Sequence, residues 1–164
     1  MVKLGVLCGV YFLWFKSNVW TLPVISTLYG YLIHYLLVSL TDITIWVLSL
    51  LDYEAIVVNL RQIDMYDLDF NIHVRNYCLG VDMMFALTAL IISFPGKWLD
   101  RIWFIPLGLV GIHTINVARV VALCVTWVRW GTNGPFDHHD VYNVVAVIFI
   151  FLLFTVWVNR YKNN

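Results

Sequence analysis

The sequence predicts an all-α polytopic membrane helix bundle with a small extracytoplasmic β-hairpin, and three observations support this fold class. Hydrophobic residues make up 62% of the 164-residue chain, charged residues make up only 12%, and the mean hydropathy is +0.82. Such a chain has too little polar surface to coat a soluble globule. Several apolar runs reach about 20 residues, the length at which a helix crosses a bilayer. One acidic stretch alternates apolar with polar residues, which is the pattern of a half-buried strand.

The first part of the chain holds two apolar segments. Residues 4–19 are apolar but short, so they are a candidate additional span that anchors the chain. The apolar run over residues 22–51 is too long for one span and too short for two. We therefore expect a span over about residues 22–40 and a separate interfacial helix, with Thr41 or Asp42 as its N-cap.

Residues 52–77 are expected to form an outer loop, because five acidic residues stand there against two arginines. From position 68 to position 75, apolar and polar side chains alternate, which predicts a strand with one buried face. Residues 55–60 are the expected partner strand. The two would form a hairpin outside the bilayer, docked on the helix ends. The alternating residues are Leu68, Phe70, Ile72 and Val74 on one face, and Asp69, Asn71, His73 and Arg75 on the other.

Three further spans are predicted, over about residues 79–95, 102–128 and 141–159. The first contains Asp82 and ends in a Phe-Pro-Gly sequence, which terminates helices. The second has Arg119 as its only formal charge, and the third has none. Because no repeat, low-complexity tract or long linker interrupts the chain, residues 1–164 are expected to form a single integral-membrane domain.

The basic residues set the expected orientation. The bases within residues 97–101 and 160–162 lie on one side of the membrane, which the positive-inside rule makes the cytoplasmic side. The acidic loop and the separate loop that contains His138 and His139 then lie together on the extracytoplasmic side. Arg119 lies about 25 Å along its helix from the cytoplasmic end, so it approaches the same outer boundary.

Arg119 is a candidate functional residue because a cation inside a membrane span is costly. Asn116 and His113 precede it at three-residue spacings, so the three polar side chains share one helix face. This face either contributes to a site or makes interhelical hydrogen bonds.

Cys78, Arg119 and the paired histidines together suit thiol chemistry. The thiolate is the nucleophile, and apolar surroundings disfavour it unless a cation lies nearby. Arg119 would supply this cation and would also stabilise the oxyanion that forms when a carbonyl is attacked. His138 or His139 would remove the thiol proton and return it to the leaving amine. Asp82, on the helix that follows Cys78, is a candidate ion-pair partner of Arg119 or of a histidine.

Other interpretations of these residues remain open. With three cysteines and no CxxC pair, the chain is neither a disulfide scaffold nor a thiol-exchange enzyme, and Cys8 and Cys124 are expected to be small buried hydrophobes. The paired histidines are alternatively solvated residues or zinc ligands. The protein is alternatively a non-catalytic membrane subunit with interhelical polar contacts. No basic cluster suggests nucleic acid, and the last span is too apolar for a channel. Local polar contacts are expected for His34, His73 and Asp42.

Four short motifs resemble the exosortase/archaeosortase family. They occur in order over a region from about Glu54 to the C-terminus, and the short chain with its double histidine is similar to the small exosortase-like proteins of Bacteroidetes-type bacteria. Leu79 departs from the family pattern, in which many members carry serine. The motifs are Cys78-Leu79-Gly80, Phe94-Pro95-Gly96, Pro106-Leu107-Gly108 leading to Asn116-Val117-Ala118-Arg119, and His138-His139-Asp140-Val141-Tyr142-Asn143.

The resemblance implies an activity and a set of site residues. Family members are polytopic transpeptidases that cut a C-terminal sorting signal, made of a short motif, a transmembrane helix and a basic tail, at the outer face of the inner membrane. Cys78 is implied as the nucleophile and Arg119 as the essential arginine, with Asn116 in support. Either His138 or His139 is implied as the acid and base, since the motif register fits both. The chemistry requires no cofactor and no metal.

Overall fold

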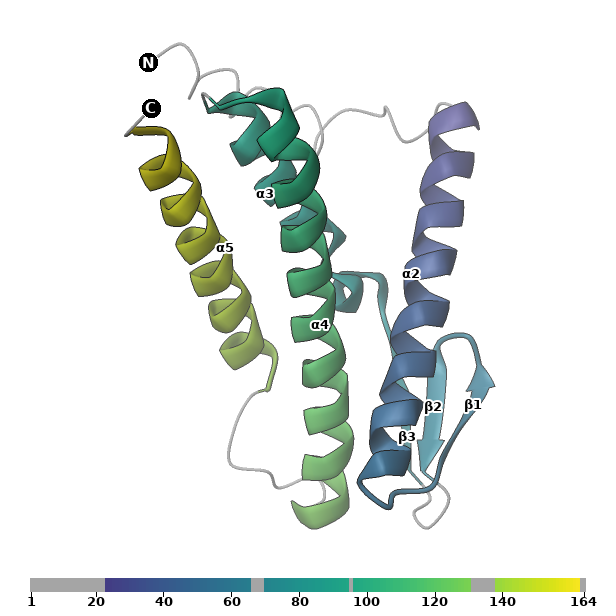
Figure 1. Ribbon diagram of the computed structural model, residues 1–164. Helices are drawn as coiled ribbons and strands as arrows, with labels where there is room; N and C mark the ends of the chain where they lie inside the picture. Colours follow the sequence, from purple (N-terminus) through teal and green to yellow (C-terminus); the bar gives the residue numbers. More distant parts are fainter. Residues whose placement is uncertain (1–22, 66–69, 95, 131–137, 163–164) are drawn as a thin grey trace.

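The computed structural model describes residues 23–65, 70–94, 96–130 and 138–162. The described part contains four α-helices, one short 3₁₀ helix and a small antiparallel sheet (Figure 1). Helices α2 and α5 flank α4, and the sheet lies beside the C-terminal half of α2 (Figure 1). The candidate additional span over residues 4–19 lies outside the described residues.

Helix α2 (Pro23–Leu50) is continuous, so the predicted break at Thr41 and Asp42 is wrong. The Thr41 hydroxyl does not cap a helix; it donates back to the carbonyls of Leu37 and Val38, at 3.0 Å each. The helix has 28 residues, about 42 Å of length, which exceeds a hydrocarbon core of about 30 Å. Its last turns are stabilised by packing instead, because Leu48 is fully buried in the cluster that joins the helix to the sheet.

The segment after α2 forms three strands, β1 (Ala55–Asn59), β2 (Gln62–Met65) and β3 (Phe70–His73), in the antiparallel order β1-β2-β3. The predicted small hairpin is present, but residues 55–60 do not pair with the strand at 70–73 as expected. β2 lies between them. Pairing through the tight turn after β1 closes a shorter loop and therefore costs less conformational entropy.

The predicted alternation is confirmed over residues 72–75, whereas Leu68, Asp69 and the side chains of Phe70 and Asn71 lie outside the described part of the structure. Ile72 and Val74 are buried in the cluster shared with α2 and α4, whereas His73 and Arg75 are exposed. Ile72 stands opposite Ile63 of β2, which is also fully buried, so one face of the sheet covers the two long helices. The opposite face is more exposed and mixed in character, with the polar residues Gln62, Asp64 and His73 beside the exposed Ile56 of β1.

The remaining helices are α3 (Val81–Ser93), α4 (Trp98–Trp130) and α5 (His138–Lys162). α4 is the central element: it packs against α2 and the sheet through one cluster, and against α3 and α5 through a second cluster around Trp157. Within the described residues, two helical segments are long and apolar enough to cross a membrane, Ser26–Leu50 and Trp98–Arg129. Val81–Ser93 and Val144–Arg160 are shorter apolar helices. The number of spans remains a prediction.

Candidate active site

Cys78 lies in a tight turn between the sheet and α3. The 3₁₀ helix η2 (Asn76–Leu79) carries it and follows β3 after two residues. The amide of Cys78 donates to the carbonyl of Arg75 at 2.9 Å, and the amide of Val74 donates to the carbonyl of Arg61 at 2.7 Å. These two bonds fix the path of the chain on both sides of the turn. The thiol is consequently held at the end of a strand, and its residue is half-buried.

The turn is tied to α4 by Asn116. Its Nδ2 donates a buried hydrogen bond of 2.9 Å to the carbonyl of Leu79. Gly80 follows with a φ of +64°, a left-handed conformation that glycine adopts at little cost. A Cβ at this position would also collide with the Asn116 amide. Glycine is therefore required here both by the backbone conformation and by the close approach of α4.

Arg119 lies about one helical turn after Asn116 on α4, and only 7% of its surface is exposed. Arg119 and Cys78 line the same cavity, which has a volume of about 400 Å³. The rest of the cavity wall comes from the segment before Cys78 and from the next turn of α4. These residues are Ile72, His73, Val74, Arg75, Val120 and Leu123.

The cavity has a positive character. Two guanidinium-bearing residues, Arg75 and Arg119, line it together with His73, and none of the described lining residues is acidic. A cationic environment favours a thiolate over a thiol and stabilises an oxyanion. The arrangement therefore suits nucleophilic attack by sulfur on a carbonyl group.

The other predicted site residues are not all brought together. Asp82 is exposed in the first turn of α3 and is not among the described residues that line the cavity. His138 and His139 begin α5, but their side chains lie outside the described part of the structure. Among the residues described, no group of three or more His, Cys, Asp or Glu side chains could hold a metal ion.

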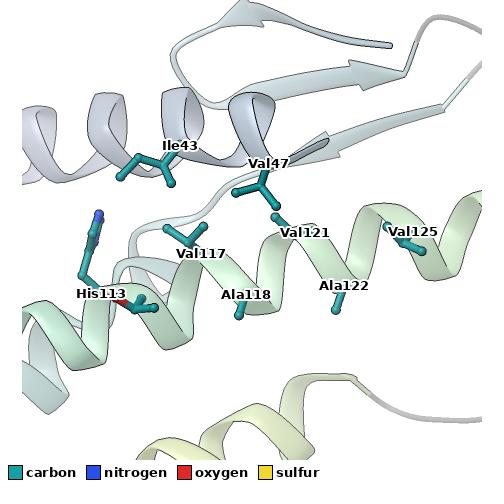
Figure 2. A pocket seen from close by; sticks show the side chains of 9 residues that line it. Ile43, Val47, His113, Val117, Ala118, Val121, Ala122 and Val125 are labelled. Carbon is teal, nitrogen blue, oxygen red and sulfur yellow. The ribbon is translucent and has the colours of Figure 1, made fainter. Parts of the chain in front are cut away.

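His113 makes an interhelical hydrogen bond, which is one of the two roles expected for the polar face of this helix. Its Nε2 and the hydroxyl of Ser39 share a hydrogen bond of 3.1 Å that links α4 to α2. His113 also lines a second cavity of about 470 Å³ between the same helices, where Ile43 and Val47 of α2 face Val117 and Val121 of α4 (Figure 2). The walls of this cavity are almost entirely apolar and contain no cysteine, and the hydroxyl of Thr114 donates back to the carbonyl of Val110. The candidate thiol chemistry therefore belongs to the cavity at Cys78.

Sequence reasoning gave His73 only local polar contacts and gave Arg75 no role. Both line the cavity because the strand that carries them runs directly into the turn with the thiol. Their short spacing to Cys78 was the available signal. The sequence does not place the two residues at the cavity, because the side-chain pattern of a strand indicates which face is buried and does not indicate what lies beside its edge.

The comparison with protein families shows which family the chain belongs to. The family model Transmembrane exosortase (Exosortase_EpsH) matches residues 6–157. This chain belongs to the transmembrane exosortase family. The match includes the N-terminal third, which the four motifs do not cover. No curated protein and no solved structure matches this exosortase. Membership implies a transpeptidase or protease activity that is embedded in the membrane and acts on protein substrates.

Proposed function

We propose that this exosortase is a cysteine transpeptidase or protease that removes a C-terminal sorting signal from exported proteins. The observation that carries the proposal is the cavity shared by Cys78 and Arg119, which come from different elements and lie far apart in the sequence. The motif resemblance, in which the same two residues are the nucleophile and the essential arginine, supports it independently.

The reaction begins with proton transfer from the Cys78 thiol to an imidazole, for which His138 or His139 is proposed. The sulfur attacks the carbonyl carbon of the scissile peptide, and Arg119 stabilises the oxyanion that forms. The C–N bond then breaks, the imidazolium returns its proton to the leaving amine, and a thioester to Cys78 remains. An acceptor amine or water attacks the thioester, loses a proton and releases the thiol.

Asn116 is proposed as a positioning residue in this scheme. Its hydrogen bond to the Leu79 carbonyl holds the Cys78 turn against the helix that carries Arg119. Asp82, which is exposed in the first turn of α3, is proposed as an ion-pair partner of Arg119 or of one of the paired histidines. Neither residue exchanges a proton with the substrate.

The substrate is proposed to be a membrane-anchored protein whose C-terminus consists of a short motif, an apolar helix and basic residues. Its helix would lie in the bilayer beside α4, and its scissile peptide would meet Cys78 just outside the hydrocarbon. The site is proposed to face the extracytoplasmic side of the bacterial inner membrane, since the flanking loop is acidic and the opposite connections are basic.

The test compares producing cells that carry the native chain, Cys78→Ala or Cys124→Ala. Cys124 is a matched control because it is fully buried on α4, away from the cavity lining. Mass spectrometry of the C-terminal peptides of membrane-anchored proteins is expected to find uncut precursors only in Cys78→Ala cells. If Cys78→Ala cells process every such protein normally while the variant is inserted and folded, the protein is a non-catalytic membrane subunit instead.

A further inference from the structure

β3 is an edge strand whose unpaired edge borders the candidate active site. The sheet order is β1-β2-β3, so β2 covers one edge of β3, and no described strand covers the other. Figure 1 shows β3 on the side of the sheet that faces α4, with β1 farthest from that helix. The cavity with Cys78 and Arg119 is lined by the end of β3 and the two residues that follow it.

The strand register identifies the backbone groups on this edge. In an antiparallel pair, residues whose amide and carbonyl both face the partner strand alternate with residues whose amide and carbonyl face away. Val74 is of the first kind, because its amide donates to the Arg61 carbonyl, and so is Ile72 two residues earlier. Asn71 and His73 are therefore of the second kind. Their amides and carbonyls point to the free edge.

The free edge leads directly to the nucleophile. Arg75 is the next residue of the edge-facing kind, and its carbonyl accepts the amide of Cys78 at 2.9 Å. The hydrogen-bonding edge thus ends where the turn with the thiol begins. A polypeptide laid along Asn71 and His73 would lie beside the strand that leads into the turn with Cys78.

The edge is suited to water or to polypeptide, and not to lipid. Unpaired amides and carbonyls are too costly to expose to hydrocarbon, so this part of the sheet lies outside the apolar core of the bilayer. An edge that presents donors and acceptors in alternation is the template on which extended peptides add as a further strand. A small ligand would use one or two of these groups, whereas an extended chain uses all of them.

We propose that β3 binds the substrate of this exosortase as an added strand, paired to the backbone of Asn71 and His73. This inference rests on the proposed function and names the form in which the substrate is recognised. The segment beside the scissile peptide is extended, and main-chain hydrogen bonds hold its carbonyl in line with Cys78. Recognition of this kind uses the main-chain amide and carbonyl of His73, so it is tested by a change that removes the amide and not only the imidazole.

The test separates the backbone of His73 from its side chain. Proline lacks an amide hydrogen, so His73→Pro removes an edge donor while leaving the bonds of Ile72 and Val74 to β2 available. His73→Ala is the matched control, because it keeps the amide and removes the imidazole. The readout is processing of the precursor that stays uncut in Cys78→Ala cells. His73→Pro is expected to slow processing about tenfold or more relative to His73→Ala, because both variants lack the imidazole and only the alanine variant keeps the amide donor.

Hydrogen–deuterium exchange gives a second measurement that does not depend on the proline variant folding. In purified Cys78→Ala protein, the amides of Asn71 and His73 are expected to exchange more slowly when that precursor is bound. Unchanged exchange of these amides, or equal processing by the proline and alanine variants, would overturn the added-strand proposal alone. If no precursor accumulates in Cys78→Ala cells, the proposed function fails and the inference fails with it.

Discussion

Asn116 and Leu79 are joined by a buried hydrogen bond of 2.9 Å. The side-chain amide of Asn116, on α4, donates it to the main-chain carbonyl of Leu79, the residue after Cys78. Arg119 follows Asn116 by three residues, a rise of about 4.5 Å along the helix. One rigid element therefore positions both the turn with the thiol and the guanidinium. The C-x-G and N-x-x-R motifs, which are far apart in the sequence, act as one structural unit.

Replacing Asn116 is expected to loosen this unit. Asn116→Ala leaves the buried Leu79 carbonyl without its donor, which costs about 1–3 kcal/mol of stability. Processing should fall more than the fraction of folded protein does, because the thiol loses its alignment with Arg119. Asn159→Ala is the control, since Asn159 is exposed on α5. Thermal unfolding in detergent and precursor processing check the two effects. Wild-type values for both in Asn116→Ala would contradict the positioning role.

Gly80→Ala is expected to destabilise the protein from the other side of the same contact. A non-glycine residue in the left-handed conformation costs about 1–2 kcal/mol, and the added Cβ would displace the Asn116 amide. Gly30→Ala is the matched control, because no heavy atom lies within 4 Å of a Cβ at that position. Chemical denaturation should show a loss for Gly80→Ala and none for Gly30→Ala. An equal loss of unfolding free energy in the two variants would show that the contact between Gly80 and Asn116 does not stabilise the protein.

The two described cysteines are expected to differ in reactivity. Cys78 is half-buried at a cavity, whereas Cys124 is completely buried between helices. The experiment uses spheroplasts, a Cys8→Ala background and a charged maleimide that does not cross membranes. The reagent should label the Cys124→Ala protein, which keeps Cys78, and should not label the Cys78→Ala protein, which keeps Cys124. Labelling that requires access from the cytoplasm would instead reverse the proposed orientation.

Local pattern predicted those parts of the fold that depend on side-chain period. The alternation correctly predicted which side chains are buried over residues 72–75, because period 2 follows from strand geometry alone. The apolar runs gave the helices. The predicted break in α2 was wrong because a helix does not have to end at the boundary of the bilayer. In the structure, packing of Leu48 against the sheet carries the helix past Asp42.

The missing parts of the site depend on contacts that leave no signal in one sequence. β2 has only four residues, too few for a convincing alternation, and its existence depends on pairing with both neighbours. The acceptor of the Asn116 bond is a backbone carbonyl, which every residue possesses. In the sequence, only the glycine at position 80 indicates that another part of the chain approaches the backbone there. Reactive residues such as Cys78 and Arg119 could be identified from the sequence, but only the structure shows that they line the same cavity.

Arg119 is expected to be needed for its shape as well as for its charge. Lysine keeps the charge but lacks the planar fork of donors that can hold an oxyanion at two points. We expect Arg119→Gln to reduce processing by about 10²–10³, the typical cost of losing an oxyanion donor, and Arg119→Lys by about tenfold or more. Arg129→Gln and Arg129→Lys are matched controls, because Arg129 is exposed on the same helix. The measurement is the rate of precursor processing, normalised to the folded protein determined by thermal unfolding. Processing by Arg119→Gln at the wild-type rate would remove Arg119 from the reaction and leave it a structural residue of the α4 face.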